Sequence, residues 1–140
     1  MTNTRAMPWP STHHGEPLPA PDEGSAPFEL IGWTIVRQTA NDVDLRVAVE
    51  VGGVPHEVRG HGSGLIAAFA DAVRHAGVRV AVPHREVHDW DGATGTVTSY
   101  VRCLIDGADI AGAGVARERG EATMRAMLAA AARSGALIGA

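Results

Sequence analysis

The sequence contains no lysine, few aromatic residues and only one cysteine. All 12 basic residues are arginine, 16 residues are acidic, and the formal net charge at pH 7 is −4. Proteins that bind nucleic acids usually display a basic patch with aromatic side chains that stack on bases. Arginine is scattered here and aromatic residues make up only 4% of the chain, so we expect no nucleic-acid partner.

Cysteine and long hydrophobic runs are equally scarce. Cys103 stands alone, which excludes an internal disulfide and a thiolate metal cluster and is typical of a reducing cytoplasm. Its apolar neighbours predict a small buried side chain rather than a nucleophile. No apolar run approaches the roughly 20 residues that span a bilayer, and no signal peptide is recognisable. We therefore expect a cytoplasmic protein without membrane contact, cofactor or bound metal.

Length and composition predict one domain with a tail. The 140 residues are 45% apolar and 20% charged, which suits a single soluble core. Most of the eight prolines fall within residues 1–27, among Ser, Thr, Glu and Asp, and this composition predicts a disordered tail. The pair His13-His14 lies in that tail and is assigned no role. The folded domain is expected over residues 28–140.

From Phe28 onward, apolar and polar residues alternate with the period of half-buried strands, and later with that of an amphipathic helix. Ser63 is placed to cap this helix, and Gly77 to end it in a left-handed conformation. The expected elements are strands at 28–38, 44–51 and 54–59, with a hairpin turn at Gly52-Gly53, and a helix at 64–76.

The same order begins again at Val78. The expected elements are strands at 78–90, 96–105 and 110–115, with a turn at Asp106-Gly107, and a helix at 118–133 that Gly135 ends. Two spacings repeat between the halves: Gly60-x-Gly62 returns as Gly112-x-Gly114, and Ala68-x-x-x-Ala72 returns as Ala122-x-x-x-Ala126.

This repeat predicts an α+β fold of two βββα units related by a pseudo-dyad. A helix would cover one face of each antiparallel sheet and leave the other face, or the sheet edges, for a partner. We therefore expect a homodimer.

A glycine-rich segment, Gly60 to Gly64, joins a strand to the first helix. Glycine lacks Cβ and tolerates positive φ, so alternate glycines can turn several N–H groups toward one point beside the positive end of a helix. A ligand carboxylate would suit this place. The alternative is a junction whose glycines only allow close packing, and the segment by itself leaves both interpretations open.

The glycine junction resembles that of a known family, the C-terminal regulatory domain of 2-isopropylmalate synthase, which citramalate synthase shares. The family has the pattern G-x-G-N-G-P here. The segment GHGSGLIAAF keeps all three glycines and departs from the pattern at Ser63, Leu65 and Ala67.

Two later segments extend the resemblance to about Leu137. The family strand D-Y-x-E-H-A is similar to residues 83–88, where Glu86 matches, and is followed by matching residues Gly92 and Tyr100. Before the last helix the family has G-x-G followed by an aspartate, and within that helix it has A-S-x-x-A. This sequence keeps the glycines and both alanines but not the aspartate. The matching residues are Gly112 and Gly114, then Ala122, Thr123 and Ala126, with Ala116 in place of the aspartate.

The resemblance implies a dimeric module of two βββα units that binds the end-product amino acid of a pathway. In the family this domain is attached to a TIM barrel that condenses acetyl-CoA with a 2-oxo acid on a divalent metal. A barrel needs roughly 250 residues, so 140 residues are not expected to form a complete synthase. The resemblance therefore implies a stand-alone regulatory module able to act in trans on a separate synthase or another biosynthetic enzyme.

Three titratable residues alternate along one expected strand. His84, Glu86 and His88 would share a face, which carries effector contacts in the resembling family, and His61 would add a third imidazole. The family typically has Tyr and Ala in place of His84 and His88, which indicates a ligand other than an aliphatic amino acid. The face suits a polar dimer seam, a ligand site, or a metal or acid–base site.

Ligand binding is the leading hypothesis, with an amino acid or related carboxylate as the ligand. One alternative is a small enzyme of specialised metabolism in which His84, Glu86, His88 or His61 transfers protons. The other is a dimerisation module without a ligand. The expected ligand contacts are Gly60, His61, Gly62, Ser63, Gly64, His84, Glu86, His88, Gly112 and Gly114.

Overall fold

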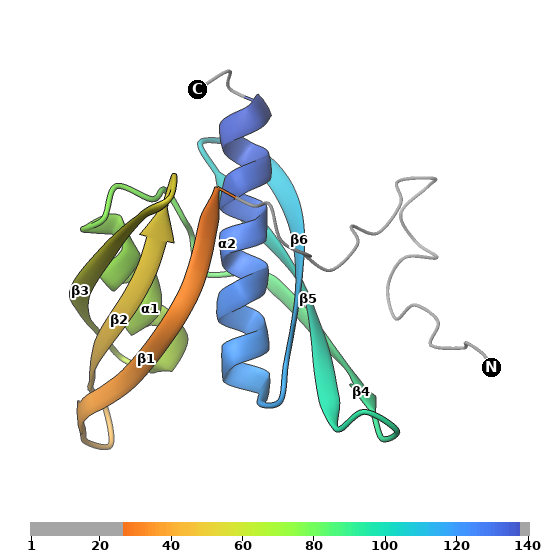
Figure 1. Cartoon of the computed structure of the whole chain (residues 1–140), viewed down its shortest axis with the longest axis horizontal. Helices are drawn as coiled ribbons and strands as arrows, with labels where there is room; N and C mark the ends of the chain where they lie inside the picture. The colour runs from red at the N-terminus through yellow and green to blue at the C-terminus, as the bar shows by residue number, and fades with distance from the viewer. Residues whose placement is uncertain (1–26, 138–140) are drawn as a thin grey trace.

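A computed structural model describes residues 27–137 as two three-stranded antiparallel sheets, each followed by a helix (Figure 1). This confirms the predicted α+β fold of two βββα units. The first unit contains β1 (Phe28–Gln38), β2 (Val43–Val51), β3 (Val54–Gly62) and α1 (Leu65–Arg74). The second contains β4 (Arg85–Asp91), β5 (Thr96–Ile105), β6 (Ala108–Ala116) and α2 (Arg119–Leu137). The predicted tail, with His13 and His14, lies almost wholly outside the described residues.

The first unit is a meander in the order β1-β2-β3. Gly52 and Gly53 both have positive φ and form the predicted two-residue link. The predicted cap at Ser63 is wrong, because Gly64 is the N-cap and no side chain bonds the helix start. Gly77 has the predicted positive φ of 87°, three residues after the helix ends at Arg74.

The second unit repeats the meander as β4-β5-β6, but its first strand is shorter than predicted. Residues 78–84 form no strand, although Val78 and Val80 are buried as the alternating pattern required. Pro83 has no N–H to donate to a ladder, and the segment is held by side-chain packing on its way between the units. Its last residue alone adds a ladder-like bond, from the His84 N–H to the Arg102 carbonyl at 2.9 Å.

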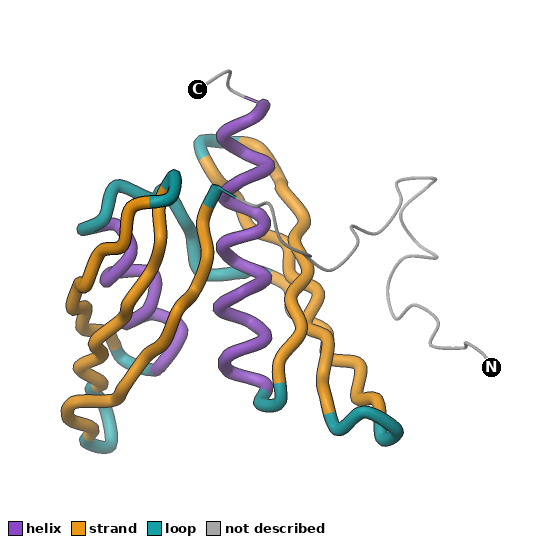
Figure 2. The backbone as a smooth tube through the Cα atoms, in the orientation of Figure 1, coloured by secondary structure: helices purple, strands orange, loops and turns teal. Residues whose placement is uncertain are grey.

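The last helix, α2, is the longest element and packs against both units. It covers β5 and β6, and its other side contacts β1 and α1 (Figure 2). It continues through Gly135 to Leu137, so the predicted stop at Gly135 is wrong. Gly135 does not have positive φ, and the helix accepts it as an interior residue.

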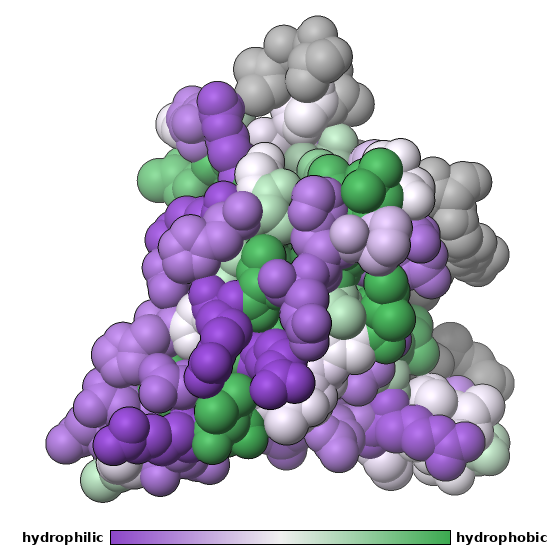
Figure 3. Space-filling view, turned by 60° about the vertical axis from the view of Figure 1, so that its left-hand side comes forward, coloured by the Kyte–Doolittle hydropathy of each residue, from purple (hydrophilic) through white to green (hydrophobic). Residues whose placement is uncertain are grey.

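One hydrophobic core joins the two units. Buried residues from both sheets and both helices form a single cluster, with Leu45 and Phe69 from the first unit and Val101, Met124 and Met127 from the second. Figure 3 shows that the side formed by the first unit is mostly hydrophilic, with hydrophobic residues in separate patches. Within residues 27–137, no helix has the length and apolar character needed to cross a membrane.

Candidate functional site

The two glycines of β3 lie where α1 approaches the sheet. A Cβ on Gly60 would stand 2.3 Å from the Ala68 carbonyl oxygen and 2.3 Å from the Ala72 nitrogen, and one on Gly62 would stand 2.6 Å from the Ala68 nitrogen. No side chain fits at such distances, so the helix backbone rests directly on these glycines. The close-packing interpretation accounts for Gly60 and Gly62, and neither has the positive φ expected of a curled anion cradle.

The glycines of β6 have the same relation to α2. A Cβ on Gly112 would stand 2.2 Å from the Ala126 carbonyl oxygen, and one on Gly114 would stand 2.5 Å from the Ala126 nitrogen. The second helix residue that a Cβ on Gly112 would contact is Ala130, just as Ala72 is the second residue that a Cβ on Gly60 would contact.

This geometry corrects the helix alignment expected from the sequence. Ala68 and Ala72 correspond in space to Ala126 and Ala130, one turn later than the predicted match to Ala122 and Ala126. Alanines at 122, 126 and 130 give α2 a repeating stripe, so the spacing of four residues fits more than one register. The alignment of the two units is therefore set by contact with the glycines.

Gly64 differs from the other glycines of the junction. It has φ −164° and open space around its Cβ position, and α1 begins after it without a side-chain cap. The first N–H groups of α1 have no side-chain cap here, and an anion is favoured at such a terminus. The N–H of His61 is already used, because it donates to the Asp71 carboxylate of α1 at 3.0 Å.

The His61 side chain lies in an acidic corner of the first unit. Its Nε2 is 3.1 Å from Asp42 and 4.0 Å from Asp44, and both imidazole and carboxylates are substantially exposed. Arg37 and Thr39 complete the lining of a hollow of about 190 Å³ around them. His61 thus belongs to the first sheet, while His84 and His88 lie with the second, and the predicted three-histidine site does not form within one sheet.

A polar network joins β4 to α2 through Thr123, which is fully buried. The Thr123 hydroxyl donates to Glu86 Oε2 at 2.9 Å and lies 2.9 Å from the hydroxyl of Ser99, which is also fully buried. His88 Nε2 lies 3.1 Å from both the Thr123 hydroxyl and Glu86 Oε2. We call these four residues, Glu86, His88, Ser99 and Thr123, the threonine network.

The proton positions of the threonine network follow from the chemistry of its groups. Thr123 has one proton, which goes to Glu86, so Ser99 donates its own proton to Thr123. The Nε2 of His88 then carries a proton directed at Glu86 and Thr123. A nucleophilic relay needs the acid and the hydroxyl on opposite ring nitrogens, whereas here both face Nε2. This arrangement stabilises the contact between β4 and α2 and does not favour the enzyme hypothesis.

His84 does not share the face of Glu86 and His88. It precedes β4, and its Nε2 lies 3.0 Å from Asp109, which also accepts from Arg102 Nε at 3.2 Å. Partial desolvation opposes ionisation of Asp109, but the hydrogen bonds and charges of His84 and Arg102 outweigh it and lower its pKa. The predicted common face fails because strand alternation does not extend to a residue outside the strand.

Two further features place limits on the chemistry. Cys103 is 1% exposed, as predicted, and burial with the nearby charges of Asp109 and Glu86 raises its pKa to about 12. A thiol with that pKa is a poor nucleophile at neutral pH. Among residues 27–137, no group of three or more His, Cys, Asp or Glu side chains is arranged to hold a metal ion.

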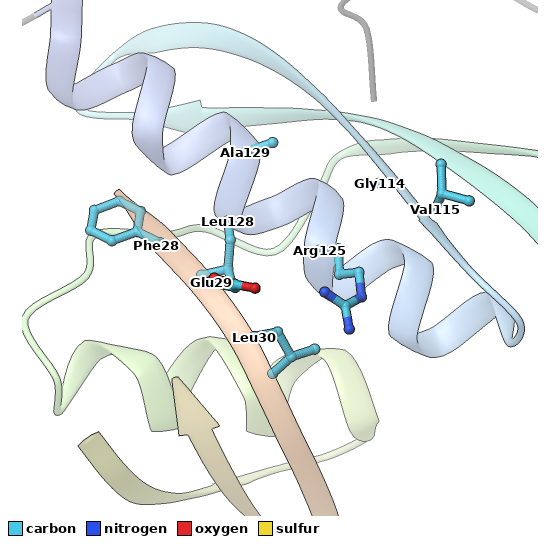
Figure 4. Close-up of a pocket in the computed structure, with 8 residues that line it drawn as sticks. All are labelled: Phe28, Glu29, Leu30, Gly114, Val115, Arg125, Leu128 and Ala129. Carbon is cyan, nitrogen blue, oxygen red and sulfur yellow. The ribbon is translucent and has the colours of Figure 1, made fainter. Parts of the chain in front are cut away.

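A small cavity of about 100 Å³ lies between β1, α2 and β6 (Figure 4). Figure 4 shows Arg125 and Leu128 on α2 projecting toward β1, with Gly114 on the far side. The volume is below the roughly 300 Å³ at which small-molecule pockets begin. Arg125 is engaged at Glu121, through two nitrogens at 2.9 and 3.1 Å from one carboxylate oxygen.

Residues 19–134 match a family described as the LeuA allosteric (dimerisation) domain. The chain belongs to this family. The match covers both βββα units and confirms the resemblance found in the sequence.

Two relatives of the LeuA-type domain carry the name 2-isopropylmalate synthase. The protein from Leifsonia xyli subsp. xyli is 29% identical over 124 residues, which are 85% of this chain and 21% of the relative. The protein from Mycobacterium leprae is 30% identical over 111 residues, which are 77% of this chain and 18% of the relative. The chain therefore spans about a fifth of the length of these relatives.

Sequence reasoning missed several residues of these clusters. Asp109 contacts His84, Thr123 contacts His88, and Ser99 contacts Thr123. Asp71 accepts a hydrogen bond from the His61 amide of the glycine junction. Thr123 and Asp109 come from elements that a strand pattern cannot align with β4, because their contacts join positions 25 to 37 residues apart. Ser99 was recoverable in principle, since it stands opposite His88 in the ladder.

Proposed function

We propose that this domain is a self-associating regulatory module that binds an amino acid or a related carboxylate. The observation that carries the proposal is the family match over both βββα units, because the family is described as allosteric and as a dimerisation domain. The module would transmit ligand binding to a synthase or another biosynthetic enzyme, in the same chain or in a separate one.

The arrangement of layers supports self-association. Within residues 27–137, α1 packs on the inner face of β2 and β3 and α2 on the inner face of β5 and β6, and the opposite faces carry no helix. The opposite face of the second sheet displays Val115, 36% exposed, at the end of the sheet away from the β5–β6 turn. A sheet face with exposed apolar residues gains free energy when a partner covers it.

The ligand is proposed to bind near the start of α1 and along β4, where the sequence placed it. The free N–H groups after Gly64 favour a carboxylate, and His88 is 23% exposed beside Glu86. His84 lies near the entry to β4 with Asp109.

Self-association is tested by light scattering during size-exclusion chromatography of the 140-residue chain. We expect a dimer, and we expect Val115→Arg to shift it toward monomer because a charge would enter the covered face. Val54→Arg is the control, since Val54 is 55% exposed at the β2–β3 hairpin of the other sheet. A monomer at every concentration would contradict this part of the proposal.

Ligand binding is tested by thermal unfolding in the presence of each of the twenty amino acids. A specific ligand at 100 times its Kd adds about 2.7 kcal/mol to the free energy of unfolding. The backbone amides of Ser63 and Gly64 and the His88 ring should then show chemical-shift changes. If no amino acid raises the transition temperature, the amino-acid part of the proposal is wrong.

A further inference from the structure

An open hollow of about 350 Å³ lies where the first unit passes into the second. It is formed by the end of α1, the segment that follows it, and the turn between β5 and β6. We call it the linker hollow. Its lining residues are Arg74, Gly77, Val78, Arg79, Val80, Ala81, Leu104, Ile105 and Asp106. No residue of the glycine junction or of the threonine network takes part.

The charged groups of the linker hollow are not equivalent. Arg79 forms a salt bridge and a hydrogen bond with Asp106. Asp106 provides the one carboxylate in the lining, and that carboxylate is therefore already paired. Arg74 is an exposed residue in the last turn of α1, and its guanidinium has no ion-pair or hydrogen-bond partner among residues 27–137. The hollow therefore offers one guanidinium that is open to an anion, close to a second that is already neutralised.

The remaining surface of the linker hollow is aliphatic. Val78, Val80 and Ile105 are at most 7% exposed and form the floor, while Leu104 is 56% exposed at the rim. An exposed leucine beside a guanidinium provides both contacts that an amphipathic anion needs. The volume lies at the lower end of the range of about 300 to 1,000 Å³ typical of small-molecule sites, so the occupant is small.

We propose that the linker hollow binds a short aliphatic carboxylate without an α-ammonium group. Its carboxylate would pair with Arg74 in the bidentate geometry that guanidinium favours, and its alkyl chain would cover Leu104 and Val80. An ammonium group would find the Asp106 carboxylate already paired with Arg79. The ligand class is thus a simple carboxylate, in contrast to an amino acid.

This site goes beyond the proposed function and does not depend on it. A ligand in the hollow would contact the segment at 78–81 that joins the units and the β5–β6 turn of the second unit. It would therefore stabilise the connection between the two halves of the molecule. Dimerisation and amino-acid binding at the glycine junction can each be absent while this site is present.

The test is an NMR titration of the ¹⁵N-labelled 140-residue chain with 3-methylbutanoate. We expect saturable shifts at the amides of Gly77, Arg79 and Asp106. L-valine carries the same branched chain with an added α-ammonium, and 3-methyl-1-butanol lacks the carboxylate, so both should bind at least tenfold more weakly. Arg74→Gln should weaken 3-methylbutanoate at least tenfold.

Arg59→Gln is the matched control, because it removes the same charge from an exposed position of β3 outside the hollow. It should leave the Kd within twofold. Absence of saturable shifts at these amides would overturn the site, as would an equal loss of binding in both arginine variants. If L-valine binds at the same amides as tightly as 3-methylbutanoate, the ligand class is wrong. Neither result bears on the oligomeric state or on shifts at Ser63 and Gly64.

Discussion

The two strand-to-helix junctions follow one plan but differ in length. In each, a glycine pair of the last strand receives the backbone of a helix, at Ala68 in the first unit and at Ala126 in the second. The path from Gly60 to Ala68 is six residues shorter than the path from Gly112 to Ala126. In the second unit the strand runs further past its glycines and the helix starts one turn earlier.

The additional turn of α2 and the residue after it carry polar contacts that the first unit lacks. Glu121 accepts a hydrogen bond from the Trp33 indole of β1 at 3.0 Å, and the Thr123 hydroxyl donates to Glu86 of β4. In the first unit, by contrast, Asp71 of α1 and His75, which caps the end of α1, form hydrogen bonds with the backbone of the unit's own edge strand β3. The comparison indicates that glycine packing builds each unit, and that the additional turn of α2 fastens the units together.

The largest expected effect tests the shared part of the plan. Gly60→Ala and Gly112→Ala each place a Cβ within 2.3 Å of helix backbone, which must move away. We expect each variant to lose about 3 kcal/mol of unfolding free energy, at the upper end of overpacking costs. Urea denaturation followed by circular dichroism measures the loss.

Gly32→Ala in β1 serves as the control for both glycine variants. A Cβ there meets nothing within 4 Å, and Gly32 does not have positive φ. Alanine should be neutral or stabilise by about 0.5 kcal/mol, because glycine costs conformational entropy in a strand. If only one of Gly60→Ala and Gly112→Ala is destabilising, the two junctions are not equivalent.

The next effect concerns a feature of the second unit alone. Thr123→Val removes the hydroxyl that Glu86, His88 and Ser99 share, and leaves the fully buried Ser99 hydroxyl without this partner. We expect a loss of about 2 kcal/mol. Thr98→Val makes the same replacement at a partly exposed position of β5 and should change stability by less than about 0.5 kcal/mol. Equal losses in both variants would show that the threonine network contributes nothing specific.

A smaller effect tests the contact between α2 and the first unit. Trp33→Phe keeps the ring but removes the hydrogen bond to Glu121, at an expected cost of about 1 kcal/mol for a partly exposed pair. Partial burial opposes ionisation of Glu121, but its bonds to Trp33 and Arg125 prevail and lower its pKa from the ordinary 4.5.

The lowered pKa of Glu121 gives this prediction a pH dependence. Its stabilising contribution is complete above pH 4.5 and is lost as the pH falls through the lower folded-state pKa. The stability difference between the wild type and Trp33→Phe should therefore narrow below pH 4.5. Trp90→Phe is the control, since Trp90 is 61% exposed and should show no such narrowing. A constant difference across this range would exclude the ionised Glu121 as the partner that matters.

Much of this fold follows from local patterns in the sequence. The bounds of β1 and β5 were predicted to the residue, because glycine or polar turns follow both strands, although the ladder of β1 has two register shifts. The repeat of glycine pairs predicted two units of the same design. The strand predicted at 78–84 is absent, because the alternation of apolar residues indicates only which side chains are buried. Val78 and Val80 are buried although this segment forms no strand ladder.

The candidate site was predicted less completely than the fold. Glu86 and His88 do share a face, but His84 lies before β4 and contacts Asp109 instead. The glycines were correctly singled out, yet their contacts are with α1 and α2 backbone, and only the packing of the helices could show that. Whether a ligand also contacts these residues stays a prediction.

The smallest expected effect concerns Cys103, which lies on the inner face of the second sheet and tests how tightly α2 closes it. The thiol ionises at pH 9.0 in the unfolded chain, while burial and the charges of Asp109 and Glu86 hold its folded-state pKa at about 12. As the pH rises above 8, the unfolded state therefore releases a proton that the folded state keeps, and stability falls. Between pH 8 and 9.5 this loss should be about 0.8 kcal/mol. Cys103→Ala should remove that slope in urea denaturation, whatever its stability at pH 8, and an unchanged slope would mean that water reaches the thiol in the folded protein.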